Sequence, residues 1–325
     1  MNTANQLYFA KWMMGMLKVG LIHRNFAEKR PMPANSGVSI TWKYMNEMAA
    51  QTTALTEGVA PAAITPTITE VTATPDEYGG FVNVTDMIEV FDTLGQILIN
   101  PSSARNVELL SQNANRTLDN LMRDVISAGT NVYYSGATTV TSRTGVGSAN
   151  IVSIADLRKI VRALRLNNVK PISGIIQGAV GQGTIPLPAS YIGFVDPYTV
   201  HDLELIPGWK SVHEYASPLS AYPDEAGYIQ GVNIRFISTT DNKVFTAGGS
   251  GGIDVYSTLI FGKEFYGETD ILGKNTIEFL AKPPGSAGTT DPLNQIASIG
   301  WKTPAYAGVI LRQVAGYRYE HAVSS

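Results

Sequence analysis

Residues 103–128 read SARNVELLSQNANRTLDNLMRDVISA, and this stretch sets the scale of the fold. Its apolar side chains recur at three- and four-residue steps, which is the spacing of one helix face. They are Val107, Leu110, Ala114, Leu118, Leu121 and Val125. Gly129 offers a C-terminal stop. At 1.5 Å per residue such a helix is roughly 38 Å long, so we predict a spine for the fold rather than an ordinary packing helix.

The chain before this helix predicts an extended hairpin. Residues 38–45 alternate apolar and polar side chains with the period of a half-buried strand. Residues 51–75 are rich in Thr and Pro with few large apolar side chains, and residues 78–86 predict another strand. Because such a segment has too little side chain for a core of its own, we expect residues 31–80 to lie over an adjacent subunit.

Residues 1–30 are interpreted as an N-terminal arm. Their apolar side chains fall mostly at helical spacings, and Pro31 and Pro33 end the segment. An arm with so many apolar side chains needs a covering surface, which we expect neighbouring subunits to provide. The residues predicted to lie at subunit interfaces are Leu7, Phe9, Met13, Leu17, Trp42, Glu57, Val59, Ile64 and Ile68.

The region after the long helix mixes helices and strands. Ser153 and Asp156 predict the start of a second helix, with Asp in place of the Glu preferred in a capping box. Strands are predicted around residues 190–195, 227–238, 255–265 and 276–280, and a short helix at 199–205. Residues 301–319 are interpreted as closing strands that return to the first sheet. The predicted fold class is α+β.

The composition is low in charge. Charged residues make up 16% of the 325 residues, against about 25% in typical soluble proteins. The net charge of −3 argues against a broadly basic nucleic-acid coat. Obligate interfaces contain fewer charges than free surface, so the deficit fits a subunit with several covered faces.

Several classes of protein are excluded by what the sequence lacks. The absence of cysteine excludes disulfides, thiolate catalysis and cysteine-ligated metals. Lys11 and Lys18 interrupt the apolar N-terminus, so we expect no signal peptide and interpret the chain as cytoplasmic. The uncharged run 171–195 contains three prolines and is not expected to cross a membrane.

No motif predicts catalysis, a metal site or a cofactor. Residues 267–274 resemble a phosphate-binding loop but have five residues where that pattern needs four. Residues 248–252 match the nucleophile-elbow pattern, although their four glycines favour a loop. The four histidines have no metal-ligand spacing. A mixed α/β hydrolase remains an alternative, and it would require a pocket with convergent polar groups.

The second helix carries a basic stripe of Arg158, Lys159, Arg162 and Arg165 opposite its apolar face. This stripe could bind phosphate or an acidic partner. A solvated helix face explains it more simply, and we favour that interpretation.

The order of these parts resembles the major capsid proteins of tailed bacteriophages, most closely the N-four-like phages and their relatives. The resemblance covers nearly the whole chain. It depends on residues 55–61 (LTEGVAP), 78–86 (YGGFVNVTD), 112–119 (QNANRTLD), 191–197 (YIGFVDP), 227–232 (GYIQGV) and 300–302 (GWK). Many relatives have His where this chain has Asp196, which weakens a site assignment there but not the fold.

The resemblance implies the Hong Kong 97-type capsid fold. Its parts would be an N-terminal arm (1–30), an extended loop (31–80), a peripheral domain with the spine helix at about 103–128 (81–150), an axial domain (151–275) and a return to the peripheral domain (276–325). It also implies hexamers and pentamers that close into an icosahedral virion capsid around double-stranded DNA, assembled in the host cytoplasm. Implied partners are scaffolding and portal proteins, with a decoration protein as a further candidate. An encapsulin-like shell with protein cargo is the alternative within the same fold.

Overall fold

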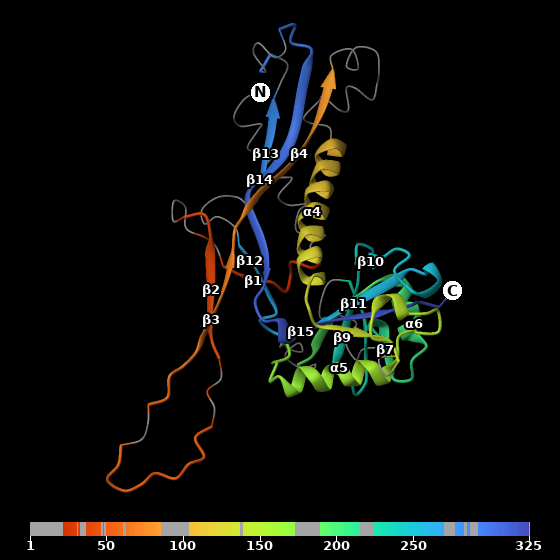
Figure 1. The fold of residues 1–325 in the computed structure, drawn as a ribbon. Coiled ribbons are helices and arrows are strands. Elements are labelled where there is room, and N and C mark those ends of the chain that lie inside the picture. The colour runs from red at the N-terminus through yellow and green to blue at the C-terminus, as the bar shows by residue number, and fades with distance from the viewer. Residues whose placement is uncertain are drawn as a thin grey trace, which may run out of the picture.

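The computed structural model describes most of the chain (Figure 1). The described residues are 22–30, 32, 37–46, 48, 50–60, 63–85, 104–136, 139–172, 189–214, 224–269, 277–282, 285–286 and 292–324. The predicted interface residues Leu7, Phe9, Met13 and Leu17 lie outside them.

The predicted long helix is present as α4 (Ala104–Ser127), which stands beside β14 (Ile296–Ile310) in Figure 1. Its buried apolar side chains are Leu110, Ala114, Leu118, Met122 and Ile126. Leu121 and Val125, which the sequence placed on this face, are only half-buried. The buried side chains are spaced four residues apart, whereas the helix has 3.6 residues per turn. The buried face therefore rotates slowly around α4, which leaves Leu121 and Val125 at its edge.

A five-stranded sheet packs against α4. Its order is β1 (Glu28–Lys29), β12 (Tyr266–Thr269), β14 and β13 (Glu278–Lys282), and β4 (Asp76–Thr85) also pairs with β14. The register of β14 on β4 shifts between Thr303 and Tyr306. Pro304 lies inside this shift, and because proline has no backbone N–H it cannot donate to the ladder there.

An eight-stranded sheet forms the second unit. Its order is β5 (Val132–Tyr134), β15 (Gly316–His321), β11 (Val255–Phe261), β6 (Tyr191–Val195), β9 (Ile234–Ser238), β8 (Glu225–Ile229) and β7 (Trp209–Ser211), with β10 (Val244–Phe245) on β11. The helices α5 (Ile154–Leu166) and α6 (Pro197–Glu204) belong to this unit in Figure 1. Short 3₁₀ turns lie at Arg143–Gly145, Val212–Glu214, Ser250–Gly252 and Gln313–Ala315. Phe194, Phe236 and Phe261 are buried in its core.

The cap of α5 confirms a prediction from the sequence. The Ser153 hydroxyl accepts a hydrogen bond from the backbone N–H of Asp156 at 3.2 Å. This bond satisfies one of the free donors at the helix start, as a capping serine does. Leu157, Ile160 and Leu164 then form the buried stripe of the helix.

The two sheets exchange chain segments, and this differs from the predicted division. Strands β5 and β15 lie within ranges expected in the peripheral domain, yet both pair in the eight-stranded sheet. Strand β12 lies in the range expected for the axial domain but pairs with β14. Of the two closing strands only β14 returns to the first sheet. The chain turns at residues 313–315, and β15 then adds its buried Tyr319 to the other core.

A separate two-stranded hairpin projects from this body in Figure 1. It consists of β2 (Ile40–Met45) and β3 (Ile68–Ala73), which pair antiparallel along their whole length. None of the helices in the described ranges is long and apolar enough to cross a membrane.

Candidate functional site

The loop at the end of the β2–β3 hairpin is exposed throughout its described part. Residues 50–60 and 63–67 are all exposed to solvent. Leu55 is 76% exposed, Val59 64% and Ile64 48%. The described part of the loop therefore leaves three large apolar side chains in contact with solvent on the single chain.

The base of the hairpin is anchored on its own chain. Ile40, Trp42 and Ala73 are buried in a small cluster with Leu311, which follows β14. Lys43 and Glu70 form an exposed cross-strand ion pair at 2.6 Å. The hairpin is therefore fixed at one end and uncovered at the other.

This arrangement corrects one predicted interface residue. Trp42 is only 4% exposed, because the inward face of β2 packs on Leu311 rather than on a neighbour. Val59 and Ile64, together with the 53% exposed Ile68 and the exposed Glu57, are accessible on the single chain. Their contact with another subunit stays a prediction.

The residues just before β1 are held by a buried polar network. The backbone N–H of His23 donates to Asp119 of α4 at 2.8 Å, and His23 Nδ1 lies 2.5 Å from the same carboxylate. The Tyr266 hydroxyl donates to the carbonyl oxygen of His23 at 2.5 Å. Burial, with the nearby charges of Asp119 and Glu268, raises the pKa of Tyr266 well above its usual value.

Arg24 makes the second part of this anchor. Its Nε donates to Glu268 of β12 at 2.6 Å, and its guanidinium lies 4.9 Å from the ring centroid of Tyr306. Lys29 approaches the other oxygen of Glu268 at 3.2 Å. The end of the predicted arm thus packs on its own subunit, in contrast to the expectation that neighbours cover residues 1–30.

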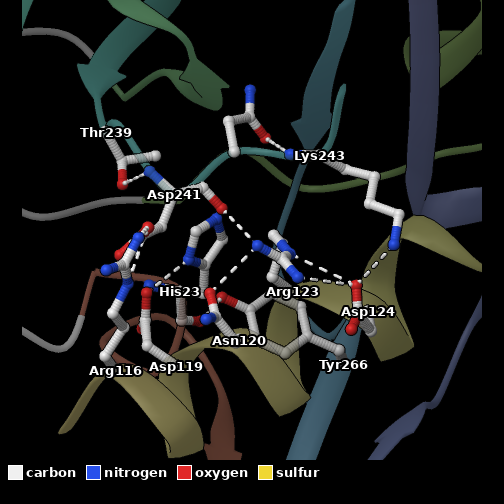
Figure 2. Close-up of polar contacts among 11 residues, drawn as sticks. His23, Arg116, Asp119, Asn120, Arg123, Asp124, Thr239, Asp241, Lys243 and Tyr266 are labelled. Carbon is white, nitrogen blue, oxygen red and sulfur yellow. Dashed lines mark hydrogen bonds and ion pairs between the residues drawn. The ribbon is translucent and has the colours of Figure 1, made fainter. Parts of the chain in front are cut away.

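Figure 2 shows a polar joint where α4 meets the loop between β9 and β10. Arg116 forms an ion pair with Asp241 at 2.5 Å. Arg123 donates to the carbonyl oxygen of Asp241 at 2.9 Å, and Lys243 lies 3.0 Å from Asp124. Partial burial raises the pKa of Asp124, but hydrogen bonds from Lys243 and Arg123 together outweigh it and lower the pKa below its ordinary value. The joint links α4 to the eight-stranded unit through charges.

The five-stranded sheet has two different faces in the first half of β14. Trp301 is buried against α4 and donates from Nε1 to Asn113 at 3.0 Å. On the other face Phe81 and Leu280 flank Gly300 in one cross-strand row, and they are 70% and 47% exposed. A side chain at Gly300 would collide with Phe81, so glycine leaves room for the exposed aromatic ring.

The residues weighed for catalysis do not form a site. Within the described ranges, no group of three or more His, Asp or Glu side chains could hold a metal ion. His201 and His213 are exposed, whereas His321 is buried and lies 2.9 Å from the Thr258 hydroxyl. Ser250 lies in a short turn before β11, as a loop interpretation expects.

The comparisons with known proteins are consistent with this picture. No curated protein sequence matches the chain. The family model described as phage capsid protein matches residues 68–319, which is most of the chain. The chain belongs to the phage capsid protein family.

Solved capsid structures share its fold. The capsid of Ralstonia phage GP4 matches with a TM-score of 0.68 at 12% identity, over 94% of this chain and 89% of that chain. The head of Helicobacter pylori bacteriophage KHP40 gives 0.59 at 15% identity, covering 91% and 87%. The capsid of cyanophage Pam1 gives 0.58 at 11% identity, covering 90% and 87%.

These matches confirm the α+β Hong Kong 97-like capsid fold, and the protein is a major capsid protein of the virion. Its family is structural rather than enzymatic. Neither the hydrolase nor the encapsulin-like alternative is favoured. The nearer resemblance to N-four-like phages stays a prediction.

Sequence reasoning missed the polar anchor and the joint. A signal for the anchor existed in α4, where Ser111, Asn115 and Asp119 form a buried polar row at four-residue steps beside the apolar one. The joint had no such signal, because its partners on the loop before β10 are more than one hundred residues away in sequence.

Proposed function

We propose that copies of this capsid protein form hexamers and pentamers that close into an icosahedral shell around double-stranded DNA. The observation that carries the proposal is the hairpin loop, anchored at Trp42 and Ala73 and exposed over residues 50–60 and 63–67. A segment of this length with uncovered Leu55, Val59 and Ile64 gains stability when a neighbouring subunit covers it.

The energetic reason is burial of apolar surface between copies. Covering one Val, Leu or Ile side chain fully is worth about 1.5–3 kcal/mol. The loop of one subunit lies on a different surface of the next, so each contact is heterologous and repeats around a closed ring. The exposed face around Phe81 offers a further apolar surface for contacts between capsomers.

The remaining partners follow from the family. Scaffolding and portal proteins would direct assembly in the host cytoplasm, and a decoration protein is a further candidate partner. A net charge of −3 favours DNA held by enclosure, with local and non-specific contacts, over a basic lining. No resident cofactor or metal is part of this proposal.

The test shortens the loop while it keeps both strands of the hairpin. Asn46 and Thr67 face each other beyond the last strand pair, with the Asn46 N–H bonded to the Thr67 carbonyl oxygen at 3.0 Å. Replacing residues 47–66 with Asn-Gly should close a two-residue turn at this point. We expect a soluble, folded subunit that forms no shells by electron microscopy, because the intersubunit segment is gone.

A matched control removes an exposed leucine from another surface. Leu205, which follows α6, is 70% exposed, and Leu205→Ser should leave shell formation unchanged. Normal particles from the shortened chain would contradict the proposed role of the loop. A deletion that also removes β3 would be uninformative, because Ala73 is part of the hairpin base.

A further inference from the structure

A basic hollow lies between the outer face of α5 and the turn that joins β8 to β9. Its volume is about 370 Å³, and Arg158, Arg162 and Arg165 line it together with Val161 and Val232. The three arginines lie at positions i, i+4 and i+7 of the helix, so they share one face. The stripe that the sequence suggested as a solvated helix face therefore borders a concave surface.

The three arginines of this hollow form no ion pair with the part of the chain that the structure describes. Among the described residues, no Asp or Glu forms an ion pair with Arg158, Arg162 or Arg165, whereas Lys159 on the same helix pairs with Asp156 at 3.2 Å. Most other arginines of the structure reach a carboxylate, as Arg143 does with Glu320 at 2.8 Å. Arg165 lies close enough to Tyr191 to interact with its hydroxyl, whereas Arg158 and Arg162 have no such partner among the described residues. Two guanidinium groups without an acid, beside a third, leave a site for an anionic oxygen.

The walls of the hollow indicate which anion fits. Val161 and Val232 give it an apolar floor, and Leu166 at the rim is 76% exposed. Gly231 has a positive φ of 85° and leaves the space above its turn open. A carboxylate on an aliphatic stem would contact both the guanidinium groups and the apolar wall.

We propose that this hollow binds an Asp or Glu side chain from a neighbouring copy of the capsid protein. The inference rests on the proposed function, because it requires assembled copies. Charge complementarity supports a second copy: α5 has four basic residues and one acidic residue in a chain of net charge −3, so the rest of the chain is more acidic still. The phosphate backbone of DNA fits less well, because it brings no apolar group for Leu166 and Val232 and favours an open basic stripe over a hollow.

Assembly measurements test the hollow directly. Arg158→Gln with Arg162→Gln removes two guanidinium groups from exposed positions, so the subunit should fold normally by circular dichroism. The control, Lys170→Gln with Lys263→Gln, removes the same charge from exposed positions outside the hollow. We expect the arginine variant to need at least about thirtyfold more protein to assemble, as for loss of a desolvated charge pair, and the control to match the wild type.

Cross-linking identifies the partner without relying on loss of assembly. In assembled particles of Arg162→Lys, a zero-length carbodiimide reagent should join the introduced amine to an Asp or Glu of another copy, which mass spectrometry would locate. Failure of the wild-type chain to assemble would count against the proposed function itself. Normal assembly of the arginine variant would overturn the inference and leave the proposed function standing. If that variant also lost binding to a labelled DNA duplex, the hollow would be assigned to DNA.

Discussion

The eight-stranded unit buries its large apolar side chains, whereas the hairpin loop and the outer face of the five-stranded sheet leave similar side chains exposed. Phe194 and Phe236 are fully buried within one chain, while Leu55 on the hairpin loop is 76% exposed and Phe81 on the five-stranded sheet is 70% exposed. The first set completes its packing inside the subunit. The second set stays exposed on the single chain, so the same residue type completes a core in one region and remains uncovered in the other.

Charged groups show the same contrast. Arg24 and Glu268 are buried and paired within the chain, and the joint of Figure 2 satisfies Arg116 and Arg123 internally. The arginines around the hollow on α5 have no acid among the described residues. The paired charges hold the subunit together, and the others belong to the hollow that we propose binds a neighbouring copy.

The largest expected effect on stability comes from replacing a buried phenylalanine, and an exposed phenylalanine serves as its comparison. Phe194→Ala creates a cavity among Phe261, Phe26 and His23 and should lower the free energy of unfolding by about 3–5 kcal/mol. Phe81→Ala should change it by less than about 0.5 kcal/mol, because the ring is mostly in water, yet reduce shell formation. Urea denaturation and electron microscopy of both variants give the two readouts. Equal loss of stability in both variants would show that Phe81 contributes to folding as much as the buried Phe194 does.

A somewhat smaller effect is expected for the buried polar anchor. Glu268→Gln leaves the buried Arg24 without a full counter-charge, and we expect about 3 kcal/mol of destabilisation. Glu70→Gln on the hairpin is the control, since its exposed ion pair with Lys43 is worth about 0–1 kcal/mol. Thermal unfolding of the two variants measures the difference. Similar melting temperatures would show that residues 22–30 do not depend on this ion pair.

The smallest effect is a pH dependence from a buried histidine. Burial lowers the pKa of His321 from 6.5 to about 4. Because the unfolded chain binds a proton below pH 6.5 and the folded chain does not until about pH 4, stability falls as the pH drops through this window. The loss between pH 7 and pH 5 should be about 2 kcal/mol.

Two variants sharpen the pH measurement. His321→Gln should remove that part of the pH dependence in urea denaturation curves. His213→Gln, at an exposed position, should keep it. An unchanged pH profile for His321→Gln would assign the acid sensitivity of the subunit to other groups.

Local patterns explain why much of the fold could be predicted. Helix α4 was predicted within one residue at each end, because its apolar period is continuous. The Ser153 cap and the alternation of β2 depend on neighbouring residues in the same way. The partner of β2 could not be predicted locally, because it is β3 within the Thr-rich stretch, while the predicted strand at 78–86 pairs with β14 as β4. The exposure of Val59 and Ile64 followed from a segment with too little side chain for a core.

The sequence by itself determined the long helix α4, the start of α5, the alternation of β2, the family motifs and the low charge content. Only the tertiary structure decided what covers each face: it buried Trp42 on Leu311, placed β15 in the eight-stranded sheet, and brought His23 to Asp119 and Arg24 to Glu268. The members of these two polar pairs are 96 and 244 residues apart in the chain. Periodicity acts over a few residues and shows which face is apolar, whereas the partner of that face depends on how distant segments cross in space.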